Sequence, residues 1–193
     1  MQMWRLCGSL LVVAGIMSTT TSCSPPVSGM TGVGVDAEGH PIIVLAWCEG
    51  AAPPERVSVS HYEDPAGPLD AVPVNTPGST YRVVDDVNFV APPLDGRSAS
   101  VRLDAPDDGW TVEPRPFELR PGVLYGAFGH QGRGDDEVNT DYVSFSAGSV
   151  ATLTPGSVLV QRYDERRSPA PGWVDVVITR DDFDRQGRDH DCR

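Results

Sequence analysis

The stretch Pro41-Ile42-Ile43-Val44-Leu45-Ala46-Trp47-Cys48 is apolar from end to end and indicates the fold class of this chain. It reads as a β-strand, and because no polar residue alternates with the apolar ones, we expect it to be central and covered on both faces. The short run 33–35 precedes it, and the turn 36–40 joins the two. The two runs therefore predict a hairpin in which Gly39 takes a positive φ.

Alternating segments follow on both sides of this hairpin. Residues 56–62 place Val57, Val59 and His61 on one face of a strand. Residues 98–103 alternate in the same way through Ala99, Val101 and Leu103, and residues 173–179 are expected to turn Val174, Val176 and Ile178 inward. Further β-like runs are 81–84, 87–90, 110–112, 123–128, 142–145 and 158–161.

Turn signals separate these runs. Pro-Gly pairs occur at 77–78, 121–122, 155–156 and 171–172, each before a β-like run, and this order suits a type II turn with glycine at positive φ. Helical periodicity is limited to a possible single turn at 149–153. Many short strands with regular turns predict an all-β fold, a single β-sandwich over residues 32–193.

The segment Leu119-Arg120-Pro121-Gly122-Val123-Leu124-Tyr125 resembles the tyrosine corner of fibronectin type III and other immunoglobulin-like domains. The resemblance implies that the Tyr125 hydroxyl ties the start of a strand to the preceding loop. More than sixty residues follow this segment. The sandwich is therefore expected to be an elaborated immunoglobulin-like domain or to have another topology.

The N-terminus has the features of an export signal. Residues 1–5 contain the single basic residue Arg5, residues 6–17 are apolar or small, and a polar run leads to Cys23. The apolar run is shorter than the ~20 residues that span a bilayer. We therefore expect residues 1–22 to be a cleaved signal peptide.

Thr20-Thr21-Ser22-Cys23 resembles the lipobox of bacterial lipoproteins, in which a small residue such as Ser22 precedes the modified cysteine. Thr20 departs from the aliphatic residue usual at its position. The resemblance implies a diacylglycerol on Cys23, and acyl CH₂ groups buried at ~0.8 kcal/mol each would hold the protein to a membrane. Residues 23–31 would then be a Cys-anchored flexible tether. Plain secretion is the alternative, because the same residues also suit an ordinary signal cleavage site.

Two further segments, GVDAEGHPIIVLAWC (34–48) and WVDVVITRDDFD (173–184) with its following cysteine, resemble small exported lipoproteins of high-GC bacteria. That resemblance implies a β-sandwich and no known activity. The export signal and the lipobox-like sequence lead us to expect the domain at the extracellular face of the cell membrane, lipid-anchored. The expected partners are the membrane itself, through the lipid on Cys23, and an envelope protein or polymer.

The cysteine count agrees with this location. Cys7 leaves with the signal, and lipid on Cys23 leaves the even pair Cys48 and Cys192, which predicts one disulfide in an oxidising compartment. Closing so long a loop would add about 4–5 kcal/mol in the chain-entropy model. The alternative is two separate thiols, one buried and one in a C-terminal tail.

Composition excludes several functions. The formal net charge is −12, which repels phosphate backbones, so nucleic acid is not an expected partner. The chain has no lysine, which excludes a lysine nucleophile, a Schiff base and a P-loop lysine. No cofactor motif is present, and we expect none.

Catalytic motifs are also missing from the sequence. It has no Gly-x-Ser-x-Gly elbow and no His-Glu-x-x-His. His61, followed by Glu63 and Asp64, could build an acid–base pair, although a partly buried strand histidine is the simpler interpretation. We therefore expect a non-catalytic binding or structural domain; an envelope hydrolase using His61 or His130 with nearby carboxylates is the alternative.

Three segments remain as binding candidates. Asp182-x-Asp184-x-x-Gly187 opens like a calcium loop, but Gln186 replaces the usual Asp or Asn, and Arg193 falls at the position of the bidentate Glu. We therefore expect a solvated tail without metal and keep a Ca²⁺-dependent module as an alternative. The loop around 133–135, Arg-Gly-Asp, is a candidate binding loop or a plain hairpin loop. Trp47, Trp110 and Trp173 are expected in the core; exposed and clustered, they could bind carbohydrate.

Overall fold

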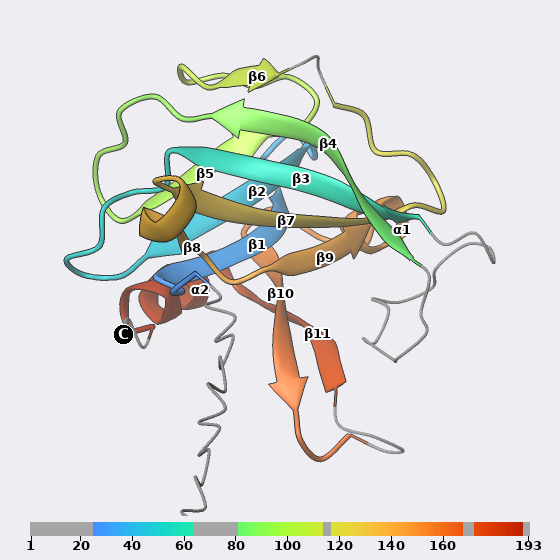
Figure 1. Ribbon diagram of the computed structural model, residues 1–193. Helices are drawn as coiled ribbons and strands as arrows, with labels where there is room; N and C mark the ends of the chain where they lie inside the picture. Colours follow the sequence, from blue (N-terminus) through green and yellow to red (C-terminus); the bar gives the residue numbers. More distant parts are fainter. Residues whose placement is uncertain (1–24, 64–80, 114–116, 168–171, 191–193) are drawn as a thin grey trace, which may run out of the picture.

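The computed structural model describes residues 25–63, 81–113, 117–167 and 172–190. Two antiparallel sheets pack face to face and form the predicted all-β sandwich (Figure 1). One sheet has the order β11-β10-β1-β2-β5, with bounds Gly172–Thr179, Ser157–Asp164, Gly29–Val35, Pro41–Trp47 and Ser98–Arg102. The other has the order β6-β4-β3-β7-β8, with β9 also paired to β7, and bounds Thr111–Glu113, Arg82–Val90, Arg56–Glu63, Leu124–Gln131, Val138–Asn139 and Val143–Ser146.

Strand β2 is central and covered on both faces, which confirms the prediction from its unbroken apolar sequence. Ile43, Leu45 and Trp47 point into the core between the two sheets. Val44 and Ala46 point the other way and join a second apolar cluster with Phe183 of helix α2 (Arg180–Arg188). The apolar run therefore serves two cores at once.

The strand pairing corresponds to that of immunoglobulin-like sandwiches. Strands β1, β2 and β5 form one sheet in the manner of strands A, B and E, and β4, β3, β7 and β9 form the other in the manner of C′, C, F and G. The chain after β9 adds helix α1 (Ala147–Val150), the β10–β11 hairpin and α2. This C-terminal elaboration accounts for the residues that follow the tyrosine corner.

The tyrosine corner itself is present at the start of β7. Tyr125 is fully buried, and its hydroxyl accepts hydrogen bonds from the backbone N–H of Arg120 at 3.0 Å and from the Arg120 side-chain Nε at 3.2 Å. Gly122, in the intervening Pro-Gly turn, has a φ of +72°. Gly39 and Gly156 also take the expected positive φ, at +89° and +83°.

Two boundaries differ from the predictions. Strand β1 begins at Gly29, so the last three residues of the expected tether, 29–31, belong to the sheet, where Thr31 is buried against Thr140. The runs 81–84 and 87–90, apart from Tyr81, belong to one continuous strand, β4, with a register shift opposite Val59 and Ser60. The bulge interrupts the alternation of side chains along β4, so the sequence pattern predicted two strands where the structure has one.

The C-terminal run is a helix, and the prediction of a solvated tail was wrong for the described part, up to residue 190. Thr179 caps α2 by accepting a hydrogen bond from the Asp182 N–H, and acidic residues open the helix while Arg185 and Arg188 close it. Phe183 is fully buried in the second apolar cluster. The burial of this single ring against the sheet outweighs the polar character of the rest of the helix.

Candidate functional site

The β10–β11 hairpin projects beyond the opposite sheet (Figure 1). In the register of the two strands Leu159 lies opposite Val177, Gln161 opposite Asp175, and Tyr163 opposite Trp173. Leu159 belongs to the core between the sheets. The side chains further along the same face of the hairpin lie beyond the opposite sheet, which no longer covers them (Figure 1). We call Gln161, Tyr163, Trp173, Asp175 and Val177 the hairpin face.

Large apolar side chains of the hairpin face are open to solvent. Tyr163 and Trp173 are each 55% exposed and Val177 is 56% exposed. The two aromatic rings touch edge to face, with centroids 5.6 Å apart and an interplanar angle of 72°. Beside them, Gln161 Nε2 donates to Asp175 Oδ1 at 3.1 Å. The face therefore combines an aromatic corner with an amide–carboxylate pair.

The opposite face of the hairpin is anchored to the sandwich. Val176 and Ile178 pack with α2 and the second apolar cluster, and Arg162 donates to the side chain of Gln186 on α2. We expected Val174, Val176 and Ile178 to point inward; Val176 and Ile178 turn toward α2 instead, away from the core between the sheets. Arg167 Nη1 also donates to the carbonyl oxygen of Trp173 at 2.9 Å. The aromatic corner is thus held on a braced ribbon.

The three tryptophans divide between core and surface. Trp47 and Trp110 are buried, as predicted. Trp173 is exposed, so its assignment to the core was wrong, and its aromatic neighbour is Tyr163 on the adjacent strand. The alternation of β11 contained the signal, because Trp173 has the parity of Asp175 and the opposite parity to Val176. The pairing with Tyr163 depends on the register of the hairpin.

His61 lies in a charged cluster at the inner face of β3. It is 9% exposed; its Nδ1 lies 2.7 Å from Asp86 Oδ2 and its Nε2 lies 3.3 Å from Glu63 Oε1. Arg82 binds the other oxygen of Glu63, and that hydrogen bond, followed by the one from His61, lowers the pKa of Glu63. The sequence pointed to Glu63. It did not point to Asp86, which comes from the neighbouring strand β4.

The charged groups of this cluster are hydrogen-bonded to one another. Carboxylates contact both ring nitrogens of His61, and the ring packs edge to face on Tyr125. A general base needs a free nitrogen within reach of a nucleophile or water. The geometry is that of a buried, hydrogen-bonded strand histidine, and it gives the hydrolase alternative no support at His61.

His130 does contact a serine, but in an arrangement unsuited to acyl transfer. Ser58 Oγ lies 3.0 Å from His130 Nε2 and donates to Asn88 Oδ1 at 2.7 Å. A hydroxyl has one proton, so His130 is the donor to Ser58 in this arrangement. Ser58 is paired with both neighbouring strands, so the backbone beside its hydroxyl is engaged in the sheet and is not open to an oxyanion. Burial lowers the pKa of His130.

The segment with a calcium-loop pattern lies inside α2. The Asp182 carboxylate contacts Thr179 and Arg185, and Asp184 accepts from Arg180 Nε at 3.1 Å. A helix spreads these carboxylates around its axis, whereas a calcium loop wraps them around the ion. Within the described ranges, no group of three or more His, Cys, Asp or Glu side chains is arranged to hold a metal ion.

The Arg-Gly-Asp tripeptide forms part of the turn between β7 and β8. Arg133 and Gly134 are exposed, and the backbone of 134–136 makes one 3₁₀ turn. This loop is separate from the hairpin face, which lies on β10 and β11. It stays a candidate binding loop on sequence grounds alone.

The predicted cysteine sites are only partly within the described residues. Cys48 is 2% exposed, and its sulfur lies 3.7 Å from the carbonyl oxygen of His190. Cys23 and Cys192 lie outside the described residues.

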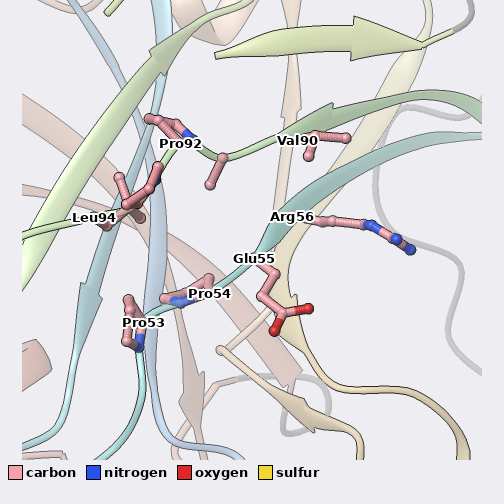
Figure 2. Close-up of a pocket in the computed structure, with 9 residues that line it drawn as sticks. Pro53, Pro54, Glu55, Arg56, Val90, Pro92 and Leu94 are labelled. Carbon is pink, nitrogen blue, oxygen red and sulfur yellow. The ribbon is translucent and has the colours of Figure 1, made fainter. Parts of the chain in front are cut away.

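One hollow lies at the end of the sandwich where β3 begins and β4 ends. Figure 2 shows Pro53 and Pro54 on one side of it and Pro92 and Leu94 on the other. Its volume is about 390 Å³, and Glu55 and Arg56 supply the charged side chains of the lining. The rest of the lining is apolar, and Figure 2 shows Glu55 and Arg56 extending in different directions, so the hollow lacks the converging polar groups that orient a small ligand. It is a weaker candidate than the hairpin face.

Comparison with known protein families, with curated proteins and with solved structures finds no significant match to this chain. None of the helices in the described part of the chain is long and apolar enough to cross a membrane.

Proposed function

We propose that this chain is an exported lipoprotein whose β-sandwich is a non-catalytic binding module at the outer face of a cell membrane. The signal-like residues 1–22 and the lipobox-like sequence ending at Cys23 support the address. The first sheet residue is Gly29. Few residues therefore separate the lipid from the domain, which would hold the sandwich close to the membrane surface.

The observation that carries the binding role is the exposure of Tyr163 and Trp173 on a braced hairpin. Clustered aromatic side chains in water are uncommon on monomeric proteins and mark interaction sites. Tryptophan and tyrosine are also the side chains that contribute most to binding energy at interfaces. The envelope component that covers this face is a protein or a polymer.

A disulfide between Cys48 and Cys192 is part of the proposal. The Cys48 sulfur beside the carbonyl of His190 supports it, and an oxidising compartment outside the membrane would maintain it. The bond would fasten the chain after α2 to the C-terminal end of β2. It would also stabilise the helix that braces the hairpin.

The address is tested by the intact mass of the protein from a membrane fraction, with and without reduction and thiol alkylation. We expect loss of residues 1–22, a diacylglycerol adduct, and two thiols that alkylate only after reduction. A full-length chain with reactive thiols and no adduct would overturn the proposal.

The binding role is tested by sedimentation of the purified full chain, in detergent micelles, with delipidated envelope particles. We expect the wild type to sediment with the particles and the double variant Trp173→Ala/Tyr163→Ala to remain in solution. Val83→Ala is the matched control, because Val83 is a similarly exposed apolar residue, at 52%, in the other sheet. Equal sedimentation of the double variant and the wild type would show that the hairpin face is not the binding surface.

A further inference from the structure

We infer that the hairpin face binds a neutral saccharide chain of the cell envelope, made of pyranose rings with equatorial hydroxyls. This inference rests on the proposed binding role of the same face and names the class of ligand. It follows from the side chains that the hairpin register brings together: the aromatic pair Tyr163 and Trp173, and the polar pair Gln161 and Asp175.

The aromatic corner suits a single sugar ring. A pyranose with equatorial hydroxyls has an apolar C–H face, and such a face stacks on an aromatic ring. Because Tyr163 and Trp173 meet at 72°, they form no flat platform. One ring can carry the C–H face of the sugar while the other bounds its edge.

The polar pair supplies the hydrogen bonds that a sugar needs. Gln161 Nε2 has two N–H groups and uses one for Asp175; the second N–H, the Gln161 carbonyl and the remaining Asp175 oxygen can face hydroxyls. Vicinal hydroxyls both donate and accept, which matches an amide beside a carboxylate. An apolar protein surface would leave the second N–H and the carbonyl of Gln161 and the remaining Asp175 oxygen without partners and so lose affinity.

Charge selects a neutral polymer. The five side chains of the hairpin face include one carboxylate, Asp175, and none of the five is cationic. Arg162 binds Gln186 on the other side of the hairpin, and Arg167 at the turn is engaged by the carbonyl oxygen of Trp173. The whole chain has a formal net charge of −12. An acidic polysaccharide or a phosphate-bearing polymer would be repelled, whereas a neutral glycan is not.

Shape also favours a chain over a small molecule. The hairpin face is the open side of a two-stranded ribbon, and the apolar hollow near Pro53 lies elsewhere, between β3 and β4. An open face buries little of a free monosaccharide, but a polymer can contact it at successive rings. Affinity for one oligosaccharide should accordingly be modest and should grow with chain length.

The test repeats the sedimentation with envelope particles treated with protease to remove protein, and adds tetrasaccharides of β-linked glucose and of β-linked N-acetylglucosamine as competitors. We expect the full chain to bind the protein-free particles and to be displaced by at least one of the two tetrasaccharides. Trp173→Ala should weaken binding about tenfold or more, and Gln161→Ala several-fold, while Val83→Ala leaves it unchanged. Binding should also persist when the salt concentration is raised to about 0.5 M, because a neutral ligand makes no screened ion pair.

The failures of the two proposals are distinguishable. Binding that needs the hairpin face but disappears after protease treatment, or that neither tetrasaccharide displaces, overturns the saccharide and leaves the binding role in place. Sedimentation that is unchanged by Trp173→Ala/Tyr163→Ala overturns both. Circular dichroism of each variant shows whether the sandwich is intact, and the milder Tyr163→Phe, which keeps the ring, should retain most of the binding.

Discussion

The hydroxyl of Tyr125 accepts a hydrogen bond from the backbone N–H of Arg120 at 3.0 Å, across the Pro-Gly turn that precedes β7. The Tyr125 ring is fully buried and packs on Phe117 and Phe145. Tyr125 thereby connects the core to the loop that precedes β7. Immunoglobulin-like sandwiches use this link to set the start of a central strand.

Removing that hydroxyl should weaken the fold without changing it. We expect Tyr125→Phe to lower the free energy of unfolding by about 1–1.5 kcal/mol, since the Arg120 donors lose their protein acceptor while the ring keeps its packing. Urea denaturation measures the change. Tyr163→Phe, which removes an exposed hydroxyl, should shift it by less than about 0.5 kcal/mol. Equal effects of the two variants would contradict the role of the corner.

Gly187 should tolerate no methyl group, although alanine is the better helix former. A Cβ at Gly187 would lie 2.3 Å from the Ala46 Cβ and 3.1 Å from the Ala46 backbone. We therefore expect Gly187→Ala to destabilise the protein by about 1–3 kcal/mol through overpacking of α2 on β2. The control is Gly148→Ala in α1, whose nearest contact is Ser146 Oγ at an ordinary 3.6 Å, and which should be neutral or stabilising by up to ~1 kcal/mol. A stabilising Gly187→Ala would mean that α2 packs less closely than described.

Stability should depend on pH through His130. Burial holds the pKa of His130 below its ordinary value of 6.5, so the unfolded chain takes up a proton at a higher pH than the folded chain. The free energy of unfolding should therefore fall as the pH is lowered from about 7 through the folded pKa. Urea midpoints across this range check the slope, which should flatten in His130→Gln.

Ser58→Ala is the matched control for that slope. It removes the hydrogen bond to His130 but leaves the burial that dominates the shift in the His130 pKa. The pH dependence of the free energy of unfolding should therefore be the same in Ser58→Ala as in the wild type. An NMR titration of His130 with a midpoint at or above 6.5 would refute the predicted sign. Glu63, whose pKa is lowered by Arg82 and His61, contributes its own pH dependence at lower pH, below the carboxylate's ordinary 4.5.

The proposed bridge predicts a loss of stability on reduction. Adding a thiol reductant to the wild type should lower the free energy of unfolding by about 2–5 kcal/mol, because a bond from Cys48 to Cys192 closes a loop of most of the domain. Cys192→Ser should show the same loss in the absence of reductant and no further change in its presence. Identical unfolding of reduced and oxidised protein would exclude the disulfide.

Most strands could be predicted because their signals are local. Period-two alternation identified β3 and β5, and the apolar run 41–48 identified β2 as a strand covered twice. The turns at Pro-Gly 121–122 and 155–156 could be predicted because glycine adopts positive φ without steric strain. The tyrosine corner was also local, since its donor and acceptor are five residues apart.

Helix α2 escaped prediction because its stability is not local. The segment has one large apolar residue, Phe183, and no repeated apolar stripe. The outer face of β1 and β2 supplies the surface that makes the helix stable: Gly32 and Gly187 leave space there, and Phe183 fills part of it. Sequence periodicity carries no information about such a vacancy on a distant sheet.

The hairpin face could also be predicted only in part from the sequence. Trp173, Asp175 and Val177 share one side of β11 by alternation alone, and this much is encoded in the order of residues. Whether that side is core or surface depends on how far the opposite sheet extends, and the pairing of Trp173 with Tyr163 depends on the hairpin register. Local sequence thus determined the strands, the turns and the alternation of their faces, because these arise from backbone sterics and neighbouring residues. The cover over each face, the cluster around His61 and the exposure of the aromatic corner arose from contacts between segments far apart in the chain, and only packing of the complete sandwich specifies those contacts.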